Sequence, residues 1–337
     1  MKKLLHTNEF YLALIILILS IIINLKSGAF FTLGNLFDLL RSGTVMGIFV
    51  IAEMIVIISG GIDISFPAIA SFSMYLTTKI LVSNNYNGSI IFAFLVAGII
   101  GVLLGLINAI FISIFKLPTF IVTLGTSSMF SGFLLAFIGS REISNIPDVM
   151  TNFSKMTIFK VKSNTGVISS LPYSFLIFLF IAIFVWILLK YTLLGRGIYA
   201  IGGDINAAER AGFNVKLIQI FIYGFVGFIS GIGGFIHTCM MQNSNPVNLL
   251  GLELIVIAAV VLGGTKITGG YGTVIGALLG LFLVIIMNNS LILLGIPSYW
   301  QTFVTGVLIL IGTSVTAYQG KIRKSNLSYL NDNLSET

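Results

Sequence analysis

Charged side chains are scarce in this sequence: Asp, Glu, Lys and Arg make up 9% of its 337 residues, whereas hydrophobic residues make up 57%. A soluble domain carries about 25% charged residues and needs them to cover its water-facing surface. The mean hydropathy of +1.06 is instead typical of a chain surrounded by lipid. The composition therefore excludes a soluble globular enzyme and predicts an all-α polytopic membrane protein.

Cysteine and histidine are also rare, with one cysteine (Cys239) and two histidines (His6 and His237). These numbers exclude a disulfide framework, a four-cysteine zinc site, an iron–sulfur cluster held by this chain alone and a histidine-rich metal site. The patterns G-x-x-x-x-G-K-[ST], H-E-x-x-H and G-x-S-x-G are missing from the sequence. We therefore predict no catalytic residues, no metal site, no cofactor and no hydrolysis of ATP by this chain alone.

Long apolar runs dominate what is present. A helix needs about 20 mainly apolar residues to cross about 30 Å of hydrocarbon, and ten such runs can be delimited. They cover approximately residues 10–25, 43–59, 64–82, 89–115, 119–139, 173–191, 216–237, 250–263, 271–294 and 301–319. The third is weak because Asp63 and Pro67 near its start suggest a broken or re-entrant segment, and the eighth is short and contains Glu253. Ten spans are expected, with eight as the alternative.

Basic residues gather in alternate loops between these runs. If both termini are cytoplasmic, most Lys and Arg residues fall in cytoplasmic loops, as the positive-inside rule requires. The net charge of +7 is thus a topology signal and does not indicate nucleic-acid binding. We expect one transmembrane domain over residues 1–325 and a short polar tail over residues 326–337.

Two hydrophilic segments interrupt the apolar runs. The extracytoplasmic loop 140–172 is too long for a tight connection, which favours a functional role. The cytoplasmic segment 195–215 contains Asp204 and Asn206, either of which can cap a helix, and Gly212, which can end it. Segment 195–215 is therefore predicted to form a surface helix of about two turns.

Spaced glycine pairs suggest close helix packing, and a short repeated motif suggests internal repetition. G-x-x-x-G pairs let helix backbones approach each other, and ordinary helix packing is their expected role. The pairs are Gly101/Gly105, Gly227/Gly231 and Gly276/Gly280. The run GGIDIS at residues 60–65 is echoed by GGTKIT at 263–268, and repeats in transporters place the substrate pathway at the repeat interface.

A few polar residues in or beside the apolar runs are candidates for a pathway. An ionised carboxylate inside a span costs about 2.5 to 3.5 kcal/mol, so Glu53 is expected to face a cavity or a partner, or to be protonated. The alternative for each of these residues is a hydrogen bond between helices that serves packing alone. The pathway candidates are Glu53, Asp63, Ser65, Asn108 and Asn288.

Several stretches together resemble the permease subunits of ribose-type ATP-binding cassette (ABC) importers, the simple-sugar branch with ribose, xylose, galactose and autoinducer-2 members. They are SGGIDIS at residues 59–65, GRGIYAIGG with the following NAA and AG at 195–212, AAVVLGGT at 258–265 and the Asn pair at 288–289. The similarity spans residues 41–319, and the order of its motifs is specific.

The resemblance implies a multi-span permease of the bacterial cell (inner) membrane that moves a small polar solute inward, with a monosaccharide favoured. The implied partners are an ABC ATPase subunit that hydrolyses ATP, an extracytoplasmic solute-binding protein, a second permease copy (identical or paralogous) and membrane lipid. In that family the stretch matching 195–212 looks like the coupling segment that docks on the ATPase. The docking residues expected on this basis are Asn206, Ala207, Ala208, Glu209, Arg210 and Gly212.

Two departures from the family pattern affect one wall of the expected pathway. Family members typically have Val-Gly-Ser after GGIDIS, whereas this chain has Phe66, Pro67 and Ala68, and Glu53 stands where an uncharged residue is expected. The solute identity of the sugar members therefore does not transfer directly. Two alternatives stay open: an ion-coupled secondary transporter that works without an ATPase, with Glu53 as its proton or sodium site, and a membrane scaffold that transports nothing.

Overall fold

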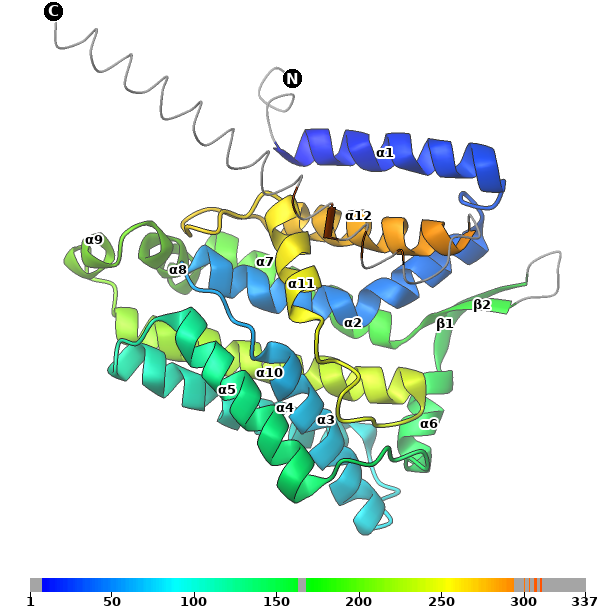
Figure 1. Ribbon diagram of the computed structural model, residues 1–337, viewed down its shortest axis with the longest axis horizontal. Coiled ribbons are helices and arrows are strands. Elements are labelled where there is room, and N and C mark those ends of the chain that lie inside the picture. The colour runs from blue at the N-terminus through cyan, green and yellow to red at the C-terminus, as the bar shows by residue number, and fades with distance from the viewer. Residues whose placement is uncertain are drawn as a thin grey trace, which may run out of the picture.

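Helices dominate the computed structural model, which describes residues 8–162, 168–293, 300, 303, 306, 307 and 310 (Figure 1). The long helices are α1 (Asn8–Ser27), α2 (Leu33–Ile58), α3 (Phe66–Ser83), α4 (Ile90–Ala109), α5 (Thr119–Phe133), α7 (Ser174–Tyr191), α10 (Val215–Met241) and α12 (Val274–Leu293). The shorter ones are α6 (Asp148–Lys155), α8 (Leu193–Gly203), α9 (Ile205–Arg210) and α11 (Glu253–Leu262), and the π-helical turns η2 (Ile110–Ile114) and η3 (Leu134–Ile138) extend α4 and α5. Strands β1 (Thr157–Lys162) and β2 (Ile168–Pro172) form an antiparallel hairpin.

Nine of the ten predicted apolar segments are confirmed as helices, and the tenth (301–319) lies outside the described residues except at a few positions. Within the described part of the chain, six helices are long and apolar enough to cross a membrane: α1, α2, α4 with η2, α5 with η3, α7 and α10. α3 is one unbroken helix, whereas the 10 residues of α11 reach only about 15 Å at 1.5 Å per residue. The mainly helical, polytopic class is thus confirmed, and the number of spans stays a prediction.

The bundle is built around α2 and α10. α10 packs against α4, α3 and α2, and α2 packs in turn against α12, α7 and α11. Residues 47–58 of α2 are all buried, whereas α1 lies at the periphery along α12 (Figure 1). Exposed Leu, Ile and Phe side chains cover the outer faces of α1, α4, α5 and α7, as expected for helices that face lipid.

The two G-x-x-x-G pairs of α4 and α10 lie against each other. A Cβ atom on Gly101 would overlap the carbonyl oxygen of Gly227, and one on Gly227 would overlap that of Gly101. A Cβ on Gly105 would lie 3.1 Å from the Cα of Gly227. The two backbones are therefore in direct contact, which confirms the packing role predicted for these pairs.

The third G-x-x-x-G pair holds α12 against α11 in the same way. A Cβ on Gly276 would overlap the carbonyl oxygen of Gly263, and one on Gly280 would overlap that of Ala259. Short α11 is thus fixed along its length by backbone contact with α12.

The loop 140–172 forms α6 and the β1–β2 hairpin, at the end of the molecule opposite α8 and α9 (Figure 1). The hairpin pairs Phe159 with Leu171. It is anchored on α2, because the Ser169 hydroxyl donates to Asp38 Oδ2 at 3.2 Å and the Phe159 ring stacks on Phe37 with centroids 6.4 Å apart. These contacts give the described part of the loop a defined structure, and its functional role stays a prediction.

We expect Gly227→Ala to destabilise the bundle, because the added methyl group would collide with the α4 backbone. Overpacking of this kind costs about 1 to 3 kcal/mol and should lower the SDS concentration at which the purified protein unfolds in mixed micelles. The matched control is Gly125→Ala in α5, where a Cβ atom meets nothing within 4 Å. It should be neutral or slightly stabilising because Ala favours a helix over Gly. Equal unfolding midpoints for the two variants would contradict the packing described here.

Candidate functional site

The second hydrophilic segment forms two short helices, α8 and α9, at one end of the bundle (Figure 1). α9 is the predicted surface helix. Asp204 is its N-cap, because its Oδ1 accepts the Ala207 N–H at 3.0 Å. Gly212 lies beyond its end at φ 88°, in a C-cap where the Phe213 N–H donates to the Ala208 carbonyl at 3.1 Å. The predicted start and stop signals of α9 are therefore confirmed.

The sequence patterns did not predict α8. Its glycines count against a helix, since each is less favourable than Ala by about 1 kcal/mol. Tertiary packing overrides that cost: Gly195 lies against the backbone of Leu189, and Gly197 lies against the side chain of Ile218. The available signal was Thr192, whose Oγ1 accepts the Gly195 N–H at 3.0 Å and caps α8.

Four glycines join α8 to the ends of two other elements, and we call them the glycine junction: Gly60, Gly202, Gly269 and Gly270. A Cβ on Gly202 would overlap the carbonyl oxygen of Ile58 and lie 2.5 Å from the Gly270 nitrogen. The Gly270 N–H donates to that same Ile58 carbonyl at 2.8 Å. Because only glycine lacks the clashing atom, the backbones of α8, the α2 end and the α11–α12 loop meet directly.

The hydroxyl of Tyr199 reinforces the junction. It donates to the Gly272 carbonyl of the α11–α12 loop at 2.8 Å. Burial, with a smaller contribution from the neighbouring Tyr271, raises the pKa of Tyr199 above its ordinary value. The hydroxyl therefore keeps its proton at neutral pH and can donate this bond.

The four candidates Glu53, Asp63, Ser65 and Asn108 lie together in one buried cluster, each no more than 1% exposed. Glu53 Oε1 accepts the Asp63 N–H at 3.1 Å. Asp63 Oδ1 accepts both the N–H and the hydroxyl of Ser65 at 2.6 Å, and the Asn108 amide donates to the Ser65 hydroxyl at 2.7 Å. Residues from α2, the α2–α3 loop and α4 thus form one hydrogen-bonded chain, which we call the buried polar cluster.

The buried polar cluster sits at the N-terminus of α3, which begins inside the molecule. The Asp63 carboxylate lies where the helix dipole and the free N–H groups of the first turn favour an anion. Pro67 falls in the first turn of α3, where its missing N–H is not needed. Glu53 Oε2, Asp63 Oδ2 and Asn108 Oδ1 have no hydrogen-bond partner among the described residues. Such buried acceptors make the cluster sensitive to any change of charge or shape.

Loop 59–65 connects the buried polar cluster to the glycine junction. Its bond from Asp63 to Glu53 requires the loop to fold back along the last turns of α2. At its other end Gly60 adopts φ 87° and lies beside Gly202. Loop 59–65 therefore contacts α8 at one end and belongs to the buried polar cluster at the other.

The segments after α2 and α11, which the sequence suggests as a repeat, have the same backbone geometry when aligned one residue differently. Gly60 and Gly264 have φ values of 87° and 89° and end α2 and α11. The N–H groups of Gly61 and Thr265 each donate to a carbonyl five residues earlier, the pattern of a Schellman cap. Gly60 therefore corresponds to Gly264 and not to Gly263, because the shared feature is the cap geometry.

The remaining predicted residues are dispersed. Asn288 lies on α12, where its neighbour Asn289 donates to Asn35 Oδ1 at 3.1 Å, toward the opposite end of α2 from Glu53. Ala208 is 2% exposed, so its side chain faces this chain and not a surface. The other docking candidates are exposed: Asn206, Ala207, Glu209, Arg210 and Gly212.

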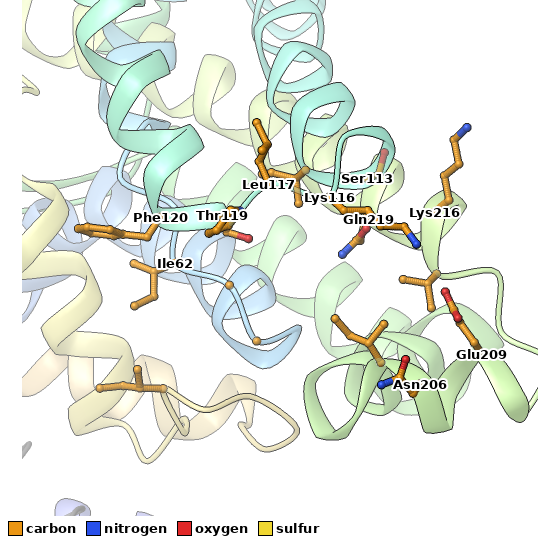
Figure 2. Close-up of a pocket in the computed structure, with 17 residues that line it drawn as sticks. Ile62, Ser113, Lys116, Leu117, Thr119, Phe120, Asn206, Glu209, Lys216 and Gln219 are labelled. Carbon is orange, nitrogen blue, oxygen red and sulfur yellow. The ribbon is translucent and has the colours of Figure 1, made fainter.

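A cavity of about 690 Å³, which we call the inner cavity, opens between α9, loop 59–65 and the α4–α5 turn (Figure 2). Asn206 and Glu209 border it from α9, while Lys116 and Gln219 border it from the opposite side. Sequence reasoning did not find it, because its walls come from segments far apart in the chain.

The chain matches the family described as branched-chain amino acid transport system / permease component over residues 35–312. It is 32% identical over 310 residues to the ribose import permease protein RbsC of Haemophilus influenzae, covering 92% of this chain and 93% of the relative. Identity to RbsC of Bacillus subtilis is 34% over 302 residues (87% and 88%), and identity to the autoinducer 2 import system permease protein LsrC of Photorhabdus luminescens is 28% over 324 residues (96% and 93%). No solved structure matches the chain.

We expect Asp63→Ala to destabilise the protein, because it leaves the N–H and hydroxyl of Ser65 without their acceptor. Losing such a buried bond costs about 1 to 3 kcal/mol. Asp63→Asn is the matched control, since its side-chain oxygen can still accept these bonds. Unfolding in mixed micelles should rank the wild type and Asp63→Asn above Asp63→Ala, and an alanine variant as stable as the asparagine variant would refute the role of this carboxylate.

Proposed function

Because the chain belongs to the family of branched-chain amino acid transport system permease components, we propose that it is the membrane-spanning permease of an ABC importer for a monosaccharide or sugar-like solute. The observation that carries this proposal is the similarity to ribose import permeases over about nine-tenths of both chains. The six long apolar helices support a multi-pass protein of the bacterial cell membrane. The chain is then a transport subunit, and ATP hydrolysis takes place on a partner.

The solute class is proposed from the relatives and not from the family description. That description mentions branched-chain amino acids, whereas the similar curated proteins are named for ribose and autoinducer 2. Both names favour a neutral, hydroxyl-rich solute. A secondary transporter with Glu53 as its ion site is not favoured, because relatives over almost the whole chain are import-system permeases.

The partners follow from membership of an importer family. We propose an ABC ATPase on the cytoplasmic face, an extracytoplasmic solute-binding protein, and a second permease copy beside this one in the lipid bilayer. Both termini are then cytoplasmic, as the distribution of Lys and Arg favours. The α6–hairpin loop and the α8–α9 pair lie at opposite ends of the molecule, which suits one partner on each face (Figure 1).

α8 and α9 are the proposed coupling segment. α9 offers the exposed Ala207, Arg210 and Gly212 to the ATPase, while buried Ala208 fixes the helix on the bundle. The glycine junction then transmits a rigid-body movement of the ATPase to α2 and to the α11–α12 loop, because elements in direct backbone contact cannot move independently. Glu53, Asp63, Ser65 and Asn108 are proposed to shape the inner end of the pathway, and Asn288 is proposed to line it from α12.

The proposal is tested by purifying the tagged chain from its native membrane in mild detergent and identifying its companions by mass spectrometry. Recovery of an ATPase with a phosphate-binding loop, followed by ATP-dependent uptake of D-ribose by the reconstituted complex with its binding protein, is the expected result. Solute movement by the chain alone in liposomes, without ATP, would overturn the importer assignment.

We expect Ala207→Trp to abolish docking, since the indole would stand between α9 and the ATPase surface. Co-purification of the ATPase should be lost while the permease still inserts and unfolds normally. Coupling free energies of about 1 to 3 kcal/mol predict a fall in uptake of about 5- to 150-fold. Ala207→Ser keeps a small side chain and is the control; uptake unchanged in both variants would argue against docking through α9.

Variants at two adjacent glycines can distinguish ATPase docking from transmission of its movement. Gly202→Ala should place its methyl group against the Ile58 carbonyl and disturb the glycine junction, whereas a Cβ on Gly203 meets nothing within 4 Å. We expect Gly202→Ala to retain the ATPase but to lose uptake by about 5- to 150-fold, the range of typical coupling energies. Gly203→Ala should transport normally. Equal solute transported per ATP hydrolysed in the two variants would exclude the junction as the transmitting contact.

A further inference from the structure

The inner cavity has the size of a small-molecule site. Its volume of about 690 Å³ falls within the range of about 300 to 1,000 Å³ typical of ligand pockets. A monosaccharide fits such a space together with some of its water. The cavity lies outside the buried polar cluster, whose members do not line it.

The lining of the inner cavity matches a neutral polyhydroxylated solute. Ser113, Thr119 and the amides of Asn206 and Gln219 offer both donors and acceptors, which is what hydroxyl groups require. One acidic side chain, Glu209, lies across from Lys116, while the Lys216 ammonium group points away (Figure 2). Opposite charges on facing walls favour neither an anion nor a cation. The ring of Phe120, which is 50% exposed, supplies an apolar face for the C–H groups of a sugar.

The walls of the inner cavity belong to elements that the coupling segment positions. α9 forms one wall and Gly61 and Ile62 of loop 59–65 form another. Asp63 of the buried polar cluster directly follows Ile62, so the cavity lining and the cluster are adjacent in the chain. The Thr119 hydroxyl accepts a bond from Tyr223 at 3.2 Å, and Thr123 donates to the Ile62 carbonyl at 3.2 Å. These two bonds connect α5 to α10 and to loop 59–65 on the side of the cavity that faces the cluster.

Two faces of α9 have different surroundings. Asn206 and Glu209 are three positions apart and therefore lie on the same face of the helix, toward the cavity. Ala207 and Arg210 lie on the neighbouring face and do not line the cavity. One short helix thus has one face on the cavity and another available to an ATPase.

We propose that the inner cavity is a solute exit site, which takes a monosaccharide at the cytoplasmic end of the pathway and releases it when the coupling segment moves. This site deepens the proposed function and rests on it. Neither the family match nor the relatives assign a binding site to these residues.

The test uses single cysteines in the complete complex of permease, ATPase and binding protein. Leu117→Cys places a thiol on the lining of the cavity, and Leu217→Cys places one on an exposed position that does not line it. The native Cys239 is buried and does not compete for a membrane-impermeant thiol reagent. D-ribose uptake is measured before and after reagent is applied from the cytoplasmic side, with and without D-ribose during labelling.

Modification of Leu117→Cys should block most of the D-ribose uptake, while modification of Leu217→Cys should not. D-ribose should slow labelling of Leu117→Cys about tenfold at about ten times its Kd for the site, by mass action. Full uptake after labelling, or labelling that D-ribose does not slow, would overturn the exit site. Labelling of the isolated permease but never of the complex would overturn it too, because the cavity would then be an ATPase contact. Absence of ATP-dependent D-ribose uptake by the unlabelled complex with the unsubstituted permease would instead refute the proposed function.

Discussion

Direct backbone contact at glycine is the constraint on which the rest of this structure depends. In lipid, apolar side chains gain little by packing on each other, so helices associate where their backbones can approach closely. The contacts of Gly101 with Gly227 and of Gly276 with Gly263 hold the bundle together. At Gly202 the same contact joins α8 to the end of α2 and to the α11–α12 loop. A contact without side chains leaves little room between the two backbones, which is why we propose it for transmission as well as packing.

The second constraint is that polar groups inside the bundle must satisfy one another. The α2–α3 loop runs back into the protein because Glu53 accepts the Asp63 N–H and Asp63 accepts both donors of Ser65. This chain of bonds satisfies polar groups of the loop where α3 starts inside the bundle. It also explains how the chain tolerates Phe66 and Pro67 after GGIDIS: Phe66 is buried against Phe49, and Pro67 occupies a first-turn position.

Much of the fold could be predicted from local patterns. Apolar run lengths located nine helices, and Asp204 and Gly212 marked both ends of α9. α8 could not be found, because its glycines disfavour a helix locally and contacts with α7, α10 and the glycine junction stabilise it. The site was predicted in part: four of the five pathway candidates cluster, yet Ala208 turned out to be buried and the inner cavity was unforeseen.

The sequence by itself determined the lipid environment, the helical class, the family and the position of the surface helix α9. These properties depend on composition, periodicity and local signals, which act over a few residues. Only the tertiary structure decided that Glu53, Asp63, Ser65 and Asn108 touch, that Gly202 meets Ile58, and that α9 borders a cavity. The reason is physical: Asn108 and Ser65, Gly202 and Ile58, and the cavity walls belong to segments that are distant in sequence, and the packing of whole helices sets their distance.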